Sequence, residues 1–324
     1  MNLAASVATE IDEQVAQAVR TGLASLPKRL PPWLFYDQTG SRLFEEITEL
    51  PEYYLTRTER GILARHAGEM IASAADGARL RITELGAGSA EKTRLLLKAA
   101  AERQPTVVYE PVDVSASALK AARERIEREI PAVRVAPLVM DYTNDFELEP
   151  AAEGERRLVL YIGSSIGNFE PDEAAKLLGK VRAQLRAGDS LLLGVDLVKD
   201  EPILLAAYDD ASGTTAAFNK NMLARLNREL AADFDPEAFA HRAVWNQAES
   251  RIEMHLESRV AQRVRVAALD LEVDFKAGET IHTENSYKYR PGQAESMLAE
   301  AGFRAEATWT DPRGWFAVCL GRAE

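Results

Sequence analysis

The stretch "LRITELGAGSAEKT" (80–93) decides the fold of this chain. A short apolar strand, 80–88, runs into Gly86 and Gly88, and a helix is predicted directly after it, over 91–102. Glycine lets the backbone approach a ligand closely, and the start of a helix presents N–H groups without helical partners. The stretch therefore predicts a ligand-binding loop at the carboxyl end of a buried strand.

Strands and helices continue to alternate beyond this loop. The pattern predicts strands over 106–115, 133–142, 156–165 and 190–197, and helices over 117–130 and 171–189. Strands that alternate with helices at this spacing are typical of βαβ units and a parallel sheet. We therefore expect an α/β fold.

The alternation stops after Asp196. Residues 201–231 are predicted to be helical, 243–275 to form two or three antiparallel strands, and 281–289 to form another strand. A helix over 291–302 and a closing hairpin follow, and two N-terminal helices, 41–49 and 56–75, are separated by Pro51. This order predicts a sheet domain interrupted by a long insertion.

We place the domain boundaries where the alternation stops and resumes. The sheet domain is expected over 60–197 plus 287–324, and a smaller α+β domain over 1–59 plus 198–286. A cleft between two domains is the usual place for a small-molecule site.

Composition excludes several classes of function. The 324 residues include 51 acidic and 39 basic side chains, a net charge of −12, so we expect no nucleic-acid partner. The one cysteine, Cys319, lies in an apolar run and is expected in the core, and it rules out a disulfide within the chain. No signal peptide or membrane-spanning run is recognised. We expect a cytoplasmic monomer that binds no membrane and, with four histidines lacking paired spacing, no metal.

The glycine loop is similar to two known loops. One is the dinucleotide fingerprint G-x-G-x-x-G, and the other is the acidic-x-G-x-G loop of methyltransferases that use S-adenosylmethionine (SAM). Glu91 stands where the fingerprint has its third glycine. Glu84, just before the loop, suits the positively charged methionine part of SAM better than a pyrophosphate. SAM is therefore favoured over a nicotinamide cofactor.

Three further strand ends carry matching chemistry. Asp113 can accept from ribose hydroxyls, Asp141 from an adenine amino group, and Tyr142 can flank the ring. "YIGSSIGNFEP" (161–171) places small residues, an amide and an aromatic after the next strand. Open α/β sheets bind ligands at this edge. Each acid alone could be a turn residue, but together they predict the Rossmann-like sheet of class I SAM-dependent methyltransferases.

Five segments together resemble the histidine Nα-methyltransferases of ergothioneine biosynthesis. They are "LPEYYLTRTE" (50–59), "ELGAGSAEKTRLLL" (84–97), "YEPVDVSASAL" (109–119), "YIGSSIGNFEP" (161–171) and "IHTENSYKY" (281–289). The resemblance extends from about residue 30 to the end. It implies that three SAM molecules convert L-histidine into its trimethylated betaine, hercynine. It also implies a substrate domain formed by the N-terminus and the insertion.

The resemblance implies two sets of site residues. The expected SAM site comprises Tyr36, Gly86, Lys92, Asp113, Asp141 and Tyr142. The expected histidine site comprises Tyr53, Gly163, Asn168, Tyr208, Met254, Glu284 and Ser286. Lys92 would reach the methionine carboxylate, although a solvated lysine is the simple alternative. Asn168 and Tyr208 would bind the substrate carboxylate. Tyr53 and Asn168 would orient the amine, and we prefer Tyr53 to its neighbour Tyr54 because its spacing from Tyr36 fits better.

By this resemblance, the strand "IHTENSYKY" would bind the imidazole side chain of the substrate. Imidazole has two distinct nitrogens, and a carboxylate and a hydroxyl two residues apart on one strand face, Glu284 and Ser286, could each take one. A solvated edge strand is the alternative. Met254 would pack beside the ring, His282 and Lys288 share the polar face without an assigned task, and His255 and His282 are not expected to be catalytic.

Several rival functions remain in view. Tryptophan or tyrosine is the alternative substrate, for which an apolar or larger pocket would be expected instead of Glu284 and Ser286. A dehydrogenase is disfavoured by the missing third glycine, and a nucleic-acid methyltransferase by the acidic charge. A non-catalytic SAM-binding protein is disfavoured by the intact loop together with Asp113 and Asn168.

Overall fold

The computed structural model describes residues 12–144 and 146–324, which form two compact units. Within the described residues, the first unit comprises 12–54 and Asp200–Ser286, and the second comprises 55–144, 146–199 and Tyr287–Glu324. The functions expected for the two predicted domains stay predictions.

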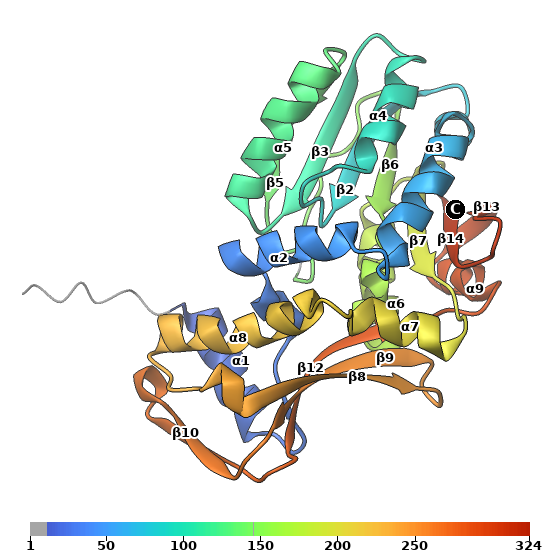
Figure 1. Ribbon diagram of the computed structural model, residues 1–324. Helices are drawn as coiled ribbons and strands as arrows, with labels where there is room; N and C mark the ends of the chain where they lie inside the picture. Colours follow the sequence, from blue (N-terminus) through green and yellow to red (C-terminus); the bar gives the residue numbers. More distant parts are fainter. Residues whose placement is uncertain (1–11, 145) are drawn as a thin grey trace, which may run out of the picture. The chain divides into compact units, whose positions relative to one another are not determined.

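The second unit is built on an eight-stranded sheet (Figure 1). Its strands are β2 (Arg79–Leu85), β3 (Val107–Asp113), β4 (Val133–Val135), β5 (Leu138–Val139), β6 (Glu155–Tyr161), β7 (Ser190–Asp196), β13 (Phe303–Thr310) and β14 (Phe316–Ala323). The strand order is β13-β14-β7-β6-β2-β3-β4, with β5 beside β3. β2, β3, β6 and β7 are parallel, whereas β14 is antiparallel to both neighbours. This order is that of the class I methyltransferase sheet, so the predicted fold class is confirmed.

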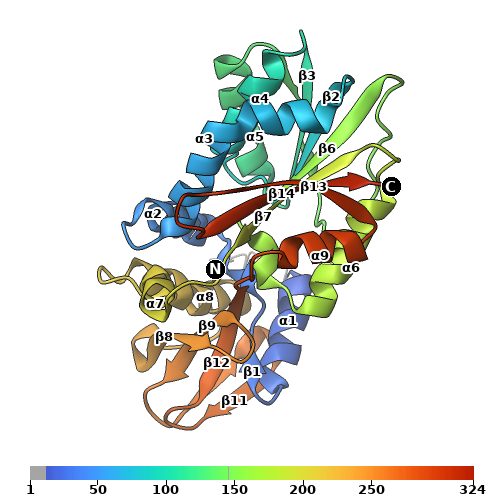
Figure 2. The ribbon, with the colours of Figure 1, turned by 90° about the vertical axis from the view of Figure 1, so that its right-hand side faces the viewer.

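Helices cover both faces of this sheet because the strands are apolar on both sides. They are α3 (Tyr54–Ala75), α4 (Thr93–Ala101), α5 (Ala116–Glu129), α6 (Pro171–Ala183) and α9 (Gln293–Glu300), with the short helix η2 (Ser165–Asn168). Figure 2 shows α3, α4 and α5 on one side of the strands and α6 and α9 on the other, and a separate core cluster lies under each group. Cys319 is buried in the second cluster, as its sequence context predicts.

The strand predicted over 133–142 is wrong in its extent. It forms two short strands, β4 and β5, with Pro137 between them. Proline has no N–H to donate to a neighbouring strand, so the pairing with β3 is interrupted there. Both pieces still pair parallel with β3.

The first unit contains a four-stranded sheet with the order β1-β12-β9-β8 and a separate pair, β10-β11. Its elements are α1 (Glu13–Ala24), β1 (Lys28–Arg29), η1 (Pro32–Phe35), α2 (Gln38–Glu49), α7 (Glu201–Tyr208), α8 (Thr214–Leu230), η3 (Pro236–Ala238), β8 (Phe239–Asn246), β9 (Arg251–Ser258), β10 (Gln262–Val266), η4 (Ala267–Leu269), β11 (Leu271–Phe275) and β12 (Thr280–Tyr287). β12, which carries most of "IHTENSYKY", lies inside the sheet, so the alternative of a solvated edge strand is wrong. No described helix is long and apolar enough to cross a membrane.

The region predicted to be helical, 201–231, forms two helices, α7 and α8, because the chain turns between them. The carboxylate of Asp210 accepts from the backbone N–H groups of Thr214 and Thr215, at 3.0 and 2.7 Å. Gly213 takes a positive φ of 77°. An aspartate that binds the backbone ahead of it competes with helix formation, and this explains the break.

The region predicted as two or three antiparallel strands contains four. The turn between β8 and β9 is closed by Asn246, whose side chain accepts from the N–H of Glu249 at 3.1 Å. Ser250 in that turn, and Asp270 between β10 and β11, take positive φ values of 57° and 47°. Such turns without glycine are hard to recognise from sequence.

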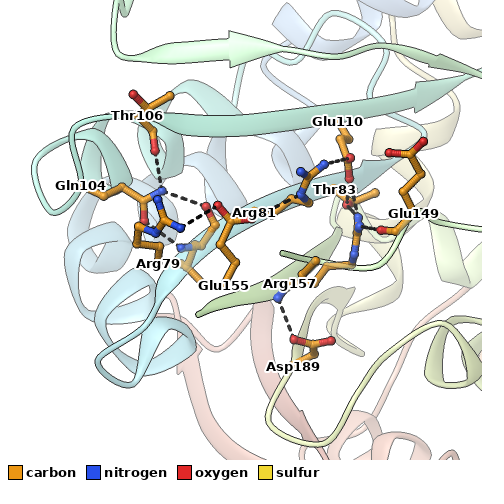
Figure 3. A network of polar contacts seen from close by, with 12 residues as sticks. Arg79, Arg81, Thr83, Gln104, Thr106, Glu110, Glu149, Glu155, Arg157 and Asp189 are labelled. Atoms are coloured by element: carbon orange, nitrogen blue, oxygen red, sulfur yellow. Dashed lines mark hydrogen bonds and ion pairs between the residues drawn. The ribbon is translucent and has the colours of Figure 1, made fainter. Parts of the chain in front are cut away.

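A buried polar network ties β2, β3 and β6 together (Figure 3). The guanidinium of Arg157 donates to Glu110 and Thr83, and the hydroxyl of Thr83 donates to Glu110 at 2.8 Å. Arg81 forms a second ion pair with Glu110. Arg157 is 1% exposed and Glu110 5%. A buried charge is tolerated only when it is paired and hydrogen-bonded, so each member depends on the others.

We expect Glu110→Leu to lower the free energy of unfolding by about 3–5 kcal/mol, because it leaves the buried Arg157 without its carboxylate. Urea denaturation followed by circular dichroism measures the change. Glu129→Leu is the matched control, since Glu129 pairs with Arg94 at a partly exposed site and should matter much less. Equal effects of the two substitutions would contradict this role of the network.

Candidate functional site

The glycine loop after β2 is held against β3 by hydrogen bonds. The N–H groups of Gly86 and Ala87 both donate to the carbonyl of Val112, at 2.9 and 3.0 Å. The N–H of Gly88 donates to the carboxylate of Asp113 at 3.0 Å. The structure therefore brings together Gly86 and Asp113, two residues of the predicted SAM site.

Tyr142 closes over the same loop. A Cβ added at Gly86 would lie 3.2 Å from the Tyr142 hydroxyl, and Gly86 has a φ of 68°. The Tyr142 ring contacts that of Tyr161 edge to face, with centroids 5.8 Å apart. Burial raises the pKa of Tyr142 to about 12, so its phenol is neutral at physiological pH. The positive φ strains any other residue, and a Cβ would also press on this tyrosine, which explains the glycine in the loop.

Asp113 and Asp141 both brace their own loops. Asp113 also accepts from the N–H of Ser115 at 2.9 Å, and Asp141 accepts from Thr143 and from the Asn144 amide. A carboxylate has about four acceptor positions, so these contacts leave capacity for a ligand. Their predicted bonds to ribose and adenine stay predictions.

Glu84, the acid just before the glycine loop, has two partners within the protein. It is buried and accepts from the hydroxyl of Thr93 at 2.6 Å and from that of Tyr109. Burial raises the pKa of Glu84 to about 7. Its carboxyl group fastens the end of β2 to α4 and β3, so it supports the loop.

Lys92 pairs with an acid that the sequence analysis left unassigned. Its ammonium forms an ion pair with Glu59 on α3, and the other carboxylate oxygen of Glu59 accepts from the N–H of Gly163 at 2.7 Å. A Cβ added at Gly163 would lie 3.2 Å from the Lys92 nitrogen. The alternative of a solvated lysine is therefore wrong, and Lys92, Gly163 and Glu59 meet at the carboxyl edge of the sheet.

Asn168 ends η2, and the segment around it is tightly held. A Cβ at Gly167 would lie 2.9 Å from the backbone oxygen of Tyr287, so this approach requires glycine. The hydroxyl of Tyr287 donates to Glu170 at 2.6 Å, and the hydroxyl of Ser164 accepts from the N–H of Asp196 at 2.9 Å. Neighbours on both sides therefore fix the position of the Asn168 backbone.

In the first unit the structure brings Tyr53, Tyr208 and Ser286 together. The two tyrosine rings are in edge contact, with centroids 6.3 Å apart, and the hydroxyls of Tyr208 and Ser286 are 2.7 Å apart. Nε2 of His241 lies 2.8 Å from the Tyr208 carbonyl, which can only accept. Nδ1 of His241 therefore accepts from the Asn219 amide at 2.9 Å, and burial lowers the pKa of the ring. A neutral His241 thus fixes the end of α7.

The simple alternation of "IHTENSYKY" is correct only as far as Asn285. Thr280 to Asn285 alternate between half-buried and buried, but Ser286 is buried as well. Nε2 of His282 contacts Oδ1 of Asn285 at 2.8 Å, although strict alternation would place these two side chains on opposite faces of the strand.

Lys288, which the alternation placed on the polar face without an assigned task, is 1% exposed and pairs with Asp196 at 2.9 Å. His282 packs its ring against that of His255, with centroids 5.2 Å apart.

Two more predicted residues lie in the first unit. Met254 is 1% exposed on β9, and its carbonyl accepts from the hydroxyl of Thr283 on β12 at 3.0 Å. Tyr36 follows η1, is 42% exposed, and contacts the rings of Phe44 and Phe218. Within the described ranges no group of three or more His, Cys, Asp or Glu side chains could hold a metal ion.

Glu59 and His241 support the site, although no local pattern in the sequence marks either residue. Glu59 ends the quoted segment "LPEYYLTRTE", yet nothing in its local pattern separates it from a solvated helix acid. His241 is one of four histidines without paired spacing. Both positions become informative only when distant segments are brought together.

Comparison with known proteins identifies one family. The model described as "Histidine-specific methyltransferase, SAM-dependent" matches residues 15–323. Histidine N-alpha-methyltransferase from Mycolicibacterium smegmatis is 50% identical over 308 residues, which cover 95% of this chain and 94% of that protein. The protein of the same name from Mycobacterium tuberculosis is 49% identical over 302 residues, 93% of this chain and 92% of that one. Ergothioneine biosynthesis protein 1 from Neurospora crassa is 30% identical over 306 residues, 88% of this chain and 32% of that protein.

Gly163→Ala should weaken SAM binding, because Gly163 has a φ of 86° and its new methyl group would press on Lys92. The backbone strain alone should cost about 1–2 kcal/mol of stability. Gly188→Ala is the control, since Gly188 has a φ of 91° and faces Arg156 instead. Isothermal titration should show weaker SAM binding for Gly163→Ala alone. An equal loss in both variants, or in neither, would contradict the placement of Lys92.

Proposed function

The chain belongs to the family of histidine-specific, SAM-dependent methyltransferases, and we propose that it transfers three methyl groups to the α-amine of L-histidine. The product would be hercynine, formed in ergothioneine biosynthesis. The family model and two relatives named histidine N-alpha-methyltransferase support the substrate and the amine. The number of methyl groups and the product form the finer part of the proposal.

One observation carries the choice of substrate. The hydroxyls of Tyr208 and Ser286 form a hydrogen bond of 2.7 Å in a buried part of the first unit. Ser286 lies two residues from Glu284 on the same strand, β12. Buried polar groups are kept where they have partners to bind. A carboxylate and a hydroxyl match the two nitrogens of an imidazole.

The loops of the second unit fit SAM. Gly86 leaves space that a Cβ would fill, and Asp113 and Asp141 keep acceptor capacity at the edge where α/β sheets bind nucleosides. We assign the ribose to Asp113, the adenine to Asp141 and Tyr142, and the methionine carboxylate to Lys92. Tyr36 is assigned to the same site from the family resemblance.

SAM supplies an electrophilic methyl group on a sulfonium. The amine nitrogen bonds to the methyl carbon as the carbon–sulfur bond breaks, the electron pair stays on sulfur, and the amine proton leaves to solvent. The chain's task is positioning, which can account for a large part of such a rate enhancement. Tyr53 and Asn168 would orient the amine of the substrate. Asn168 and Tyr208 would bind its carboxylate, and Gly163 would line the substrate site.

The specificity site is assigned to Glu284, Ser286 and Met254. Glu284 and Ser286 would bind the two ring nitrogens, and the buried Met254 would pack beside the ring. Tryptophan or tyrosine is the alternative substrate. An indole has a single N–H donor, so it would leave one of the two polar side chains without a partner. We further propose that the enzyme works as a cytoplasmic monomer without a metal.

The function is tested by incubating the pure protein with SAM and a mixture of the twenty amino acids. Mass spectrometry should show histidine alone gaining three methyl groups. Methylation of tryptophan or tyrosine instead would support the alternative substrate, and no methylated amino acid at all would contradict the proposal.

Glu284→Ala should weaken histidine binding by about 1–3 kcal/mol, because an imidazole N–H then loses its acceptor. SAM binding should remain unchanged. Glu272→Ala is the matched control, since Glu272 lies on β11 of the same unit with its side chain 60% exposed. Calorimetry of each ligand separately measures both affinities, and an equal loss for histidine and SAM would exclude Glu284 as the reader.

A further inference from the structure

Glu59 on α3 is a fully buried acid with two partners at the carboxyl edge of the large sheet. Its side chain is 0% exposed. Oε2 pairs with the ammonium of Lys92, and Oε1 accepts from the N–H of Gly163 at 2.7 Å. One carboxylate thus joins the segment that follows the glycine loop to the loop that follows β6.

The neighbouring strand is shaped to admit this carboxylate. A Cβ added at Gly194 on β7 would lie 2.3 Å from Oε1 of Glu59 and 3.2 Å from Cα of Ile162. Real atoms do not approach so closely, so only glycine at this position leaves room for Glu59. α3, β7 and the loop after β6 are therefore all fitted around the Glu59 side chain.

A buried acid at this place has a cost that packing alone would not justify. Burial of a carboxylate costs several kcal/mol, and an apolar side chain in its place would often be as stable. What Glu59 provides is an anchor for a lysine, whose four-carbon chain is otherwise flexible. The Lys92 side chain is 20% exposed, and its ammonium has three N–H donors, so it can bind Glu59 and a ligand together.

We infer that Glu59 is a positioning residue that holds the ammonium of Lys92 and the backbone of Gly163 in place to receive the carboxylate of the methionine part of SAM. The inference rests on the proposed function, in which Lys92 binds that carboxylate. The nucleoside part of SAM is assigned to Asp113, Asp141 and Tyr142, which lie in other loops. Loss of Glu59 should therefore affect one end of the ligand only.

Two ligands separate this role from a general structural one. SAM contains the carboxylate, whereas 5′-methylthioadenosine has the nucleoside and the sulfur but no carboxylate. Glu59→Gln keeps the shape of the side chain and removes its charge, and it should raise the Kd for SAM about tenfold or more, as measured by isothermal titration. The Kd for 5′-methylthioadenosine should change less than about twofold. Equal weakening of both ligands, or unchanged SAM binding, would overturn the inference.

Glu91→Gln is the matched control, because it removes the same charge one residue before Lys92 from a side chain that is 52% exposed. It should leave both Kd values unchanged. If Glu91→Gln weakened SAM as much as Glu59→Gln, the effect would be one of overall charge and the inference would fail.

A double-mutant cycle tests the path through Lys92. Glu59→Gln combined with Lys92→Met should bind SAM no more weakly than Lys92→Met alone, because the glutamine oxygen can still accept from the N–H of Gly163 and the lost charge acts through Lys92. Losses that multiply in the double variant would overturn the inference. The double variant removes both members of the pair, so it keeps the test available if Glu59→Gln alone fails to fold. A wild-type protein that binds no SAM would instead overturn the proposed function itself.

Discussion

The buried carboxylate of Asp196 is the interaction on which the architecture depends. It pairs with Lys199 at 2.6 Å and with Lys288 at 2.9 Å, and all three side chains are at most 3% exposed. Burial lowers the pKa of Lys199 to about 8. The chain leaves the second unit at Lys199 and returns to it at Tyr287, so one acid fixes both ends of the insertion. A long insertion is compatible with a continuous sheet when its ends are held together in this way.

At the carboxyl edge of the sheet, too, acidic side chains hold segments of the chain in place, here the loops that follow the strands. Asp113 binds the N–H of Gly88, Glu84 binds Thr93, and Glu59 binds both Lys92 and Gly163. The contacts of Asp113 and Glu59 are made by charged acceptors and are stronger than neutral hydrogen bonds. Loops fixed before the ligand arrives lose little freedom on binding, which favours accurate positioning of an amine and a methyl group.

Much of the second unit could be predicted from sequence because its signals are local. Apolar strands of similar length, the glycines at 86 and 88, and helices after each strand identify a parallel sheet without knowledge of long-range contacts. Prediction failed where a single residue overrides the pattern. Pro137 divides a strand, and Asp210 divides a helix by binding the N–H groups of Thr214 and Thr215.

Some residues of the candidate site could be predicted from sequence and others could not, for the same reason. Asp113 and Gly86 follow from their places at strand ends, whereas Glu59 and His241 depend on partners far away in sequence. Lys288 shows the limit most clearly, since alternation places it on the polar face with Glu284 and Ser286, whereas its side chain is buried beside Asp196. Period and spacing locate a strand, but they do not reveal which of its polar residues find a partner in the core.

We propose that the large sheet binds SAM and that Glu284 and Ser286 on β12 bind the imidazole of the substrate. A crystal structure with S-adenosylhomocysteine and L-histidine bound would test both assignments at once. The two imidazole nitrogens should lie within about 2.7–3.2 Å of Glu284 and Ser286, and the ribose hydroxyls at the same range from Asp113. An imidazole that contacts neither Glu284 nor Ser286 would contradict this proposal.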